Sequence, residues 1–226
     1  MSAAAELSLP AKATALLCVD FQHDFCSEGG FFERAGHDIV PCAAAAERTA
    51  VVVAACRDAG VTVVLTRTVR TDAPERRLRP SRHPGEEARR AAAAATLGND
   101  RYLAEAWGTQ IVEPLAPQAG DLLIEKPRQS PFHGTPLEAE LRRRDVEFVV
   151  VTGVTTNCCV DSTIRDAAVR DFEVLVLEDC VGAFGAERHL HAATLENAAR
   201  FFGVVTTSEV FLAALGLEAA RAGGAR

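Results

Sequence analysis

Short apolar runs alternate along the chain with stretches of helical periodicity, and this alternation constrains the fold more than any other feature. The apolar runs predict strands at residues 15–19, 61–65, 122–125, 147–152, 174–177 and 203–206. Helical patterns occupy residues 40–59, 136–144, 157–170 and 188–199. Strands that alternate with helices pair in parallel and bury both faces of their sheet under the helices. The chain is therefore expected to adopt an α/β fold with a mostly parallel sheet.

The size and composition of the chain fit one domain. Its 226 residues are 48% hydrophobic and 24% charged, and no stretch rich in Pro, Gly or Ser divides them. We expect one domain over residues 1–226, with frayed ends at 1–12 and 217–226. The net charge of −7 argues against a nucleic-acid partner or an anionic membrane surface.

Cysteine usage and the N-terminal residues favour a cytoplasmic protein. The seven cysteines are odd in number and lack C-x-x-C spacing, which is typical of free thiols in a reducing compartment. The opening residues M-S-A-A-A-E-L-S-L-P have neither the basic nor the apolar region of a signal peptide. No apolar run approaches the ~20 residues that span a bilayer.

The segment V-V-V-T-G-V-T-T-N-C-C-V-D-S carries candidate chemistry. Thr155, Thr156 and Asn157 offer helix-capping side chains after a Gly-containing turn. Cys158 and Cys159 then fall in the first helical turn, where the helix dipole and unpaired N–H groups lower a thiol pKa and favour the nucleophilic thiolate. The same N–H groups could bind the oxyanion formed when the thiolate attacks a carbonyl. The segment predicts covalent catalysis by cysteine, and the alternative is a buried structural thiol.

Two further reactive side chains lie at predicted strand ends. Asp20 closes the first strand and Lys126 closes the third, while the two cysteines lie just past the fourth. The carboxyl ends of parallel strands meet at one edge of the sheet, where ligands bind. A carboxylate there could take the thiol proton and an ammonium could stabilise the thiolate. Taken singly, each signal has a simpler alternative: a turn-forming Asp and a surface Lys.

Three segments together resemble a known family. They are L-L-C-V-D-F-Q-H-D-F, E-K-P-R-Q-S-P-F and V-T-G-V-T-T-N-C-C-V-D-S-T-I-R-D-A, and they are similar to the signature regions of the isochorismatase-like cysteine hydrolases. The similarity extends over about residues 16–215, in matching order. It implies a Rossmann-like three-layer sandwich of about six strands. It also implies hydrolysis of a C–N bond through a thioester, with no cofactor.

The resemblance assigns roles to individual residues. Asp20 matches the general base, Lys126 the triad lysine and Cys159 the nucleophile. Cys159 is selected over its neighbour by the family pattern N-x-C-V, since the local physics does not distinguish the two thiols. The family also implies a cis peptide bond between Val154 and Thr155, which would direct the N–H groups of Thr155 and Cys159 at the oxyanion.

The branch of the family follows from what the motifs contain and lack. Nicotinamidase-like members carry an Asp-x-His…His metal site, whereas the loop here has Asp72 and His83 without that pattern. His189 and His191 fall two residues apart in a predicted helix and do not face each other, so no metal site is expected. A nucleophilic Cys159 favours an amidase over a true isochorismatase. The segments G-G-F-F-E-R-A-G-H-D and K-P-R resemble the ureidoacrylate, biuret and N-carbamoylsarcosine branch, so the expected substrate is a small amide or ureido compound.

Polar candidates for substrate binding follow the same strand ends. Arg67 and Arg70 follow the second strand and either could pair with a substrate carboxylate, the alternative being a charge in a solvated loop. Gln22 could orient the substrate or the loop after Asp20. Gln129 follows the Lys-Pro-Arg turn and could reach the pocket. Residues 68–108 are expected to form an irregular excursion with one short helix.

Apolar candidates for the pocket wall are Phe25, Trp107 and Phe132, each of which could equally belong to the core. Arg165 and Asp166 lie on the helix after the nucleophile and are expected to form structural salt bridges.

Two other functions remain open. One is isochorismatase-type ether hydrolysis, which would use Asp20 without the thiol. The other is a catalytically silent binding or assembly subunit on the same fold, against which the intact Asp20, Lys126 and Cys159 set argues. The family resemblance also implies a homo-oligomer, a dimer or a tetramer.

Overall fold

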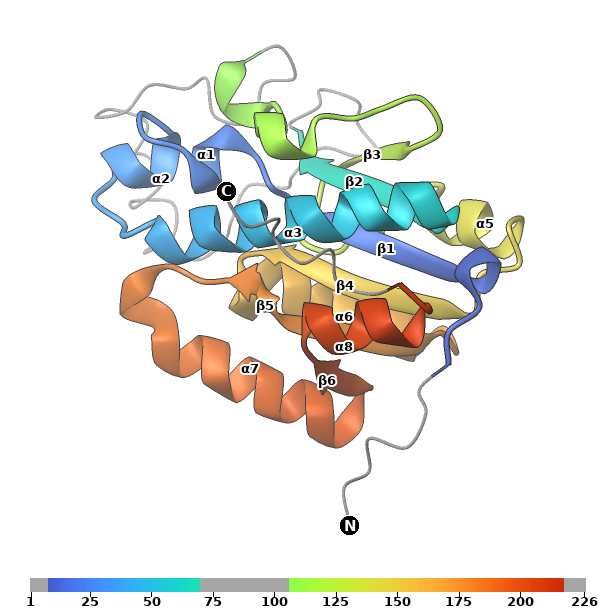
Figure 1. The fold of residues 1–226 in the computed structure, drawn as a ribbon. Helices are drawn as coiled ribbons and strands as arrows, with labels where there is room; N and C mark the ends of the chain where they lie inside the picture. The colour runs from blue at the N-terminus through green and yellow to red at the C-terminus, as the bar shows by residue number, and fades with distance from the viewer. Residues whose placement is uncertain (1–7, 70–105, 218–226) are drawn as a thin grey trace, which may run out of the picture.

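The computed structural model of the protein describes residues 8–69 and 106–217 (Figure 1). Six strands form one sheet in the order β3-β2-β1-β4-β5-β6, and every neighbouring pair is parallel. The strands are β1 (Thr14–Val19), β2 (Thr62–Thr68), β3 (Leu122–Lys126), β4 (Phe148–Val154), β5 (Glu173–Gly182) and β6 (Val204–Thr206). The predicted α/β class and the Rossmann-like arrangement of six strands are confirmed.

Helices and single helical turns connect the strands. The helices are α1 (His23–Cys26), α2 (Phe31–Arg34), α3 (Val40–Ala59), α5 (Leu137–Arg142), α6 (Asp161–Ala168), α7 (Arg188–Phe201) and α8 (Ser208–Ala214). The 3-10 turns are η1 (Ala11–Ala13), η2 (Trp107–Thr109), η3 (Glu113–Leu115) and η5 (Gly185–Glu187), and η4 (Thr156–Val160) is a π turn. No helix in the described ranges has both the length and the apolar character that crossing a membrane requires.

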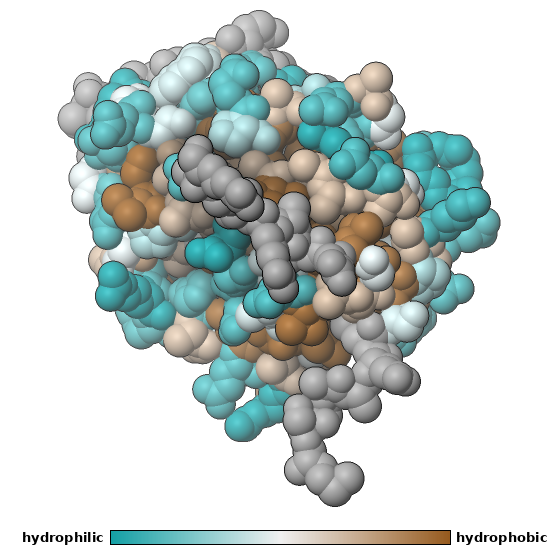
Figure 2. Space-filling model, viewed as in Figure 1, coloured by the Kyte–Doolittle hydropathy of each residue, from teal (hydrophilic) through white to brown (hydrophobic). Residues whose placement is uncertain are grey.

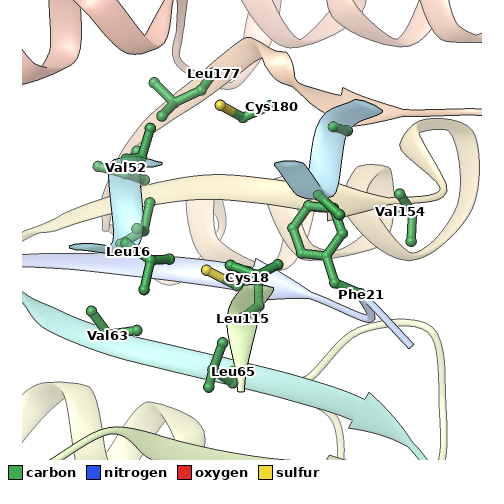
Figure 3. Packing of buried hydrophobic residues seen from close by; sticks show 14 of the residues in the cluster. Leu16, Cys18, Phe21, Val52, Val63, Leu65, Leu115, Val154, Leu177 and Cys180 are labelled. Carbon is green, nitrogen blue, oxygen red and sulfur yellow. The ribbon is translucent and has the colours of Figure 1, made fainter. Parts of the chain in front are cut away.

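Two apolar cores lie on opposite faces of the sheet because successive side chains of a strand point to opposite sides. Leu16 and Cys18 of β1 pack with α3 and α8, in the core shown in Figure 3. Ala15 and Leu17 pack instead with α5, α6 and α7. The sheet is thus the middle layer of three, and α3 crosses the front of it in Figure 1.

Helix α3 has the predicted bounds, Val40–Ala59. It ends at Gly60, whose φ of 74° lies in the left-handed region that glycine adopts without steric penalty, and whose N–H bonds the carbonyls of Arg57 and Cys56. The surface that α3 covers shows apolar residues along the helix and hydrophilic ones towards the margins (Figure 2). Val40 and Val51 of α3 are exposed apolar residues.

One local prediction needs correction. Strand β5 runs through Gly182 rather than ending at residue 177, because the polar pair Glu178 and Asp179 interrupts the apolar pattern but not the strand. The loop after β1 contains the short helices α1 and α2. Thr207 caps α8 by accepting from the amide of Val210, while the Ser208 hydroxyl bonds Asp179 at 2.6 Å.

The strand order reverses between β1 and β4, which makes their carboxyl ends the topological switch point of the sheet, where open α/β sheets bind ligands. Asp20 follows β1, and the turn η4 with its two cysteines follows β4. The topology therefore brings the predicted reactive residues to the switch point of the sheet.

Candidate active site

Asp20 follows β1 directly and is fully buried. Its backbone has φ 54°, in the left-handed region that is uncommon for a residue with a side chain. Its amide donates to the Thr66 carbonyl oxygen at 3.2 Å. Its Oδ1 accepts from Thr66 Oγ1 at 2.9 Å, and its Oδ2 accepts from Thr68 Oγ1 at 3.0 Å. Strand β2 therefore holds both the backbone and the carboxylate of Asp20.

Lys126 is the last residue of β3, and its side chain is fully buried. Nζ lies 2.6 Å from Asp20 Oδ2 and donates to Thr68 Oγ1 at 2.8 Å and to the Arg128 carbonyl oxygen at 3.0 Å. Burial acts to lower the pKa of Lys126, but Asp20 and then Cys159 outweigh burial and raise this pKa above its ordinary value. Lys126 is therefore a fixed positive charge between the carboxylate and the thiol.

Cys159 lies in η4 and is buried, whereas Cys158 in the same turn is exposed. The Cys159 thiol is near enough to the Lys126 ammonium and the Cys158 thiol for each of them to change its pKa. The hydroxyl of Thr163, on α6, donates to the Cys159 carbonyl oxygen at 2.6 Å. Of the two thiols, the buried one is the one that raises the pKa of Lys126.

The protonation of the two thiols differs from the sequence-based expectation. Interaction with the Cys159 thiol lowers the pKa of Cys158 to about 7. The same interaction raises the pKa of Cys159 well above its ordinary value, and burial and the charge of Asp20 act in the same direction. The position at a helix start does not, therefore, make Cys159 a resting thiolate. A base must take its proton before it can attack a carbonyl.

The segment before the cysteines has a specific backbone. Gly153 has φ 134°, and a Cβ there would lie 2.3 Å from the carbonyl oxygen of Val19, so only glycine fits where β4 passes β1. The peptide bond between Val154 and Thr155 is cis. Thr155 is the N-cap residue of η4, but its side chain makes no capping hydrogen bond.

The other two predicted capping residues bind α7 and its preceding turn instead. Thr156 Oγ1 is hydrogen-bonded to His191 Nδ1 at 2.9 Å, and Asn157 Nδ2 donates to Glu187 Oε2 at 3.0 Å. The capping prediction was wrong because these two side chains bond α7 and η5 rather than the backbone N–H groups of η4. They hold η4 against α7 and η5. The sequence pattern raised His191 only as a possible metal ligand. Nothing in its spacing along the chain indicated the contact with Thr156.

Gln22 orients the loop, the second of its two predicted roles. Its Nε2 donates to the carbonyls of Thr68, at 3.1 Å, and Thr109, at 2.9 Å, and its Oε1 accepts from the Thr68 amide at 2.8 Å. Both hydrogens of the amide nitrogen are used by the protein. Gln22 thus clamps the peptide groups on either side of Thr68.

Arg67 is engaged by the protein rather than free for a substrate carboxylate. It forms an ion pair with Glu125, its cross-strand neighbour in β3, and donates to Gln110 Oε1 at 3.0 Å. Arg70, with Asp72 and His83, lies outside the described residues. In residues 8–69 and 106–217, no group of three His, Cys, Asp or Glu side chains is arranged to hold a metal ion.

The apolar candidates differ in burial. Phe25 stacks on Phe32 in the α3-side core, and Phe132 lies in the opposite core near Phe172, so both are core residues. Trp107 is 52% exposed and stacks on His23 at 4.3 Å between ring centroids.

Gln129 is exposed in the loop after Lys126. On α6, the prediction of salt bridges is confirmed: Arg165 pairs with Asp161, and Asp166 with Arg170.

Thr66 and Thr68 are the site residues that sequence reasoning missed. They lie at the carboxyl end of β2, between the strands that carry Asp20 and Lys126. Thr68 is the last residue of its strand, so the meeting of strand ends at one edge of the sheet marks it as well as Asp20 and Lys126.

Comparisons with known proteins agree with this arrangement. The family model described as the isochorismatase domain matches residues 14–210. The ureidoacrylate amidohydrolase RutB of Methylobacterium radiotolerans is 35% identical over 226 residues, covering 97% of this chain and 86% of that protein. The ureidoacrylate amidohydrolase RutB of Cronobacter sakazakii is 33% identical over 219 residues, covering 94% and 93%.

Solved structures share the fold. A cysteine hydrolase from Pseudomonas syringae pv. phaseolicola superposes with a TM-score of 0.76 at 27% identity, covering 92% of this chain and 94% of that one. The N-carbamoylsarcosine amidase of Thermoplasma acidophilum superposes with a TM-score of 0.65 at 23% identity, covering 87% and 96%, a likeness of fold alone.

Proposed function

Since this chain belongs to the isochorismatase-like hydrolase family, we propose that it is a cysteine amidohydrolase. It cleaves a C–N bond of a small amide or ureido acid through a thioester intermediate. It is a hydrolase of carbon–nitrogen bonds other than peptide bonds. The proposal of cysteine catalysis through a thioester rests on one observation. It is the buried cluster of Asp20, Lys126 and Cys159 at the switch point of the sheet.

The chemistry begins with a proton transfer, because Cys159 rests as a thiol. Asp20 takes the thiol proton as the sulfur attacks the carbonyl carbon of the substrate. The carbonyl π electrons move to oxygen, and the N–H groups of Thr155 and Cys159 hold the resulting oxyanion. The tetrahedral intermediate collapses, the C–N bond breaks and the nitrogen leaves with the proton from Asp20.

Water then completes the cycle. Asp20, again a carboxylate, takes a proton from a water molecule that attacks the thioester carbon. The second tetrahedral intermediate expels the sulfur, which recovers a proton from Asp20. Throughout, Lys126 stabilises negative charge as it passes between the carboxylate and the sulfur.

The substrate class rests on the relatives named as ureidoacrylate amidohydrolases, which support a ureido acid as the substrate of this chain as well. Because Arg67 is paired with Glu125, it is a poor candidate for binding the substrate carboxylate. Gln129, exposed in the loop after Lys126, is the remaining described polar candidate for contact with a substrate. The proposed enzyme works as a homo-oligomer, which light scattering would test.

The test is ammonia release across a panel of ureidoacrylate, N-carbamoyl acids, biuret, nicotinamide and simple amides. Cys159→Ala should abolish turnover of the preferred compound, and the matched variant Cys158→Ala should keep most of it. Activity should survive EDTA, because these residues supply the nucleophile and every proton transfer. Full activity in Cys159→Ala would point to isochorismatase-type ether hydrolysis and end the amidase proposal. Absence of turnover on every compound would favour a binding subunit.

A further inference from the structure

Thr68 joins the base and the cation of the proposed site into one closed ring. Its hydroxyl accepts a hydrogen bond from Lys126 Nζ at 2.8 Å and donates its single hydrogen to Asp20 Oδ2 at 3.0 Å. Lys126 Nζ lies 2.6 Å from the same Oδ2 atom. Each of the three groups therefore contacts the other two.

Two features make the position of this hydroxyl rigid. Thr68 and Lys126 are register partners in adjacent parallel strands, so β2 and β3 fix their separation. The side chain of Gln22 bonds both the amide and the carbonyl of Thr68, at 2.8 and 3.1 Å. The backbone of Thr68 is thus fixed from β3 on one side and from the loop after Asp20 on the other.

The ring gives the two oxygens of Asp20 unequal surroundings. Oδ2 has two donors, the Thr68 hydroxyl and the Lys126 ammonium. Oδ1 has the Thr66 hydroxyl, at 2.9 Å. A carboxylate oxygen has about two lone-pair directions, so Oδ2 is saturated and Oδ1 keeps one direction for a further proton.

We infer that Thr68 is a positioning residue that anchors Oδ2 of Asp20 to Lys126 and so presents Oδ1 as the atom that receives the Cys159 proton. This inference rests on the proposed function. Without the hydroxyl, the carboxylate keeps the attraction of Lys126 but loses the second bond that fixes its rotation. General-base catalysis needs the accepting oxygen within hydrogen-bond reach of the proton it removes, so a rotated carboxylate slows the chemical step.

The experiment compares Thr68→Val, which has nearly the same shape but no hydroxyl, with Thr68→Ser, which keeps it. Thr68→Val should lower kcat on the order of 100-fold with little change in KM, because misplacement of a catalytic group affects the chemical step. Thr68→Ser should recover most of kcat. Thr66→Val should have a smaller effect, because Oδ2 keeps both partners.

Thr49→Val is the matched control for loss of a buried hydroxyl. Thr49 lies in α3 and its hydroxyl donates to the Ala45 carbonyl oxygen at 2.7 Å, away from the site. It should lose thermal stability comparably to Thr68→Val while keeping wild-type kcat. A fall in kcat of similar size in both variants would reduce Thr68 to a structural residue and overturn the inference.

A second measurement does not depend on knowing the substrate. Iodoacetamide alkylation of Cys159 at pH 7, followed by tandem mass spectrometry that separates Cys158 from Cys159, reports proton removal from the nucleophile. The Cys159 rate should fall about tenfold in Thr68→Val and return in Thr68→Ser. If wild type hydrolyses no amide but alkylation depends on Thr68, the substrate class fails and the positioning role stands. If alkylation and kcat both stay within about twofold of wild type in Thr68→Val, the positioning role fails and the amidase proposal stands.

Discussion

The two halves of the candidate site are held in different ways. In the half from β1, β2 and β3, the side chains of Asp20 and Lys126 are fully buried and bond one another and the threonines of β2. In the half from η4, the nucleophile sits on a short turn fastened to α7 and η5 by two side-chain hydrogen bonds.

The half from η4 is also less completely hydrogen-bonded and less buried. Asn157 Oδ1 is buried and has no hydrogen-bond partner among the described residues, and Cys158 is exposed. The charges are thus fixed by the sheet itself, whereas the thiol is placed by contacts between a turn and a neighbouring helix. The first half should therefore respond to mutation through stability and activity together, and the second mainly through activity.

The largest expected effect is in the first half. Lys126→Met leaves the buried carboxylate of Asp20 without its cation, which should lower the free energy of unfolding by about 3–5 kcal/mol and abolish turnover. Urea denaturation and ammonia release measure the two. The double variant Lys126→Met/Asp20→Asn removes both charges and should be more stable than Lys126→Met. Equal stability of the single and double variants would show that the ion pair does not hold this half.

In the second half, His191→Ala removes the partner of the Thr156 hydroxyl and should lower kcat about tenfold while changing the free energy of unfolding by only about 1 kcal/mol. The exposed neighbour His189→Ala is the control and should behave as wild type. In a double-mutant cycle, Thr156→Val should add little to His191→Ala. Additive effects would mean that the two residues act separately.

The pKa difference between the thiols predicts an order of alkylation. A thiol with a lowered pKa carries more thiolate at neutral pH, so the Cys158 rate should rise with pH and reach half its maximum near pH 7. Cys159, with a raised pKa, should gain rate only at higher pH. Peptide mass spectrometry between pH 5 and 10 separates the two. A Cys159 rate that saturates below pH 7 would contradict the resting thiol and hence the need for Asp20 as base.

The smallest effect is expected at the edge of the first half. Arg67→Gln breaks the partly exposed ion pair with Glu125 and should change the free energy of unfolding by no more than about 1 kcal/mol, with KM within about twofold of wild type. Glu125→Gln breaks the same pair from the other side and should also leave KM within about twofold of wild type. A large rise in KM in Arg67→Gln alone would restore Arg67 as a ligand of the substrate carboxylate.

Sequence patterns were sufficient for the parts of this protein that follow local rules. The strands were predicted because their apolar runs are continuous, and α3 because Gly60 supplies a left-handed end. The prediction ended β5 at residue 177 because the polar residues Glu178 and Asp179 interrupt its apolar run. The apolar pattern alone does not indicate that the strand continues past them.

The candidate site shows the same limit. Asp20 and Lys126 were brought together by the rule that carboxyl ends of parallel strands meet, and the structure joins them at 2.6 Å. A helix start is visible in the sequence, but the burial of Cys159 and its interaction with Cys158, which raise its pKa, are not. The contacts of Thr156 and Asn157 with α7 and η5 depend on tertiary packing for the same reason.

The distribution of the seven cysteines has a practical consequence. Cys158 is exposed and the other six are buried, and burial raises the pKa of Cys42, Cys56 and Cys180 to about 12. A maleimide dye added briefly at neutral pH should therefore attach first at Cys158, without any engineering of the chain. That position is next to the nucleophile, so the emission of the dye would report ligand arrival in real time, including for compounds that the enzyme binds but does not cleave.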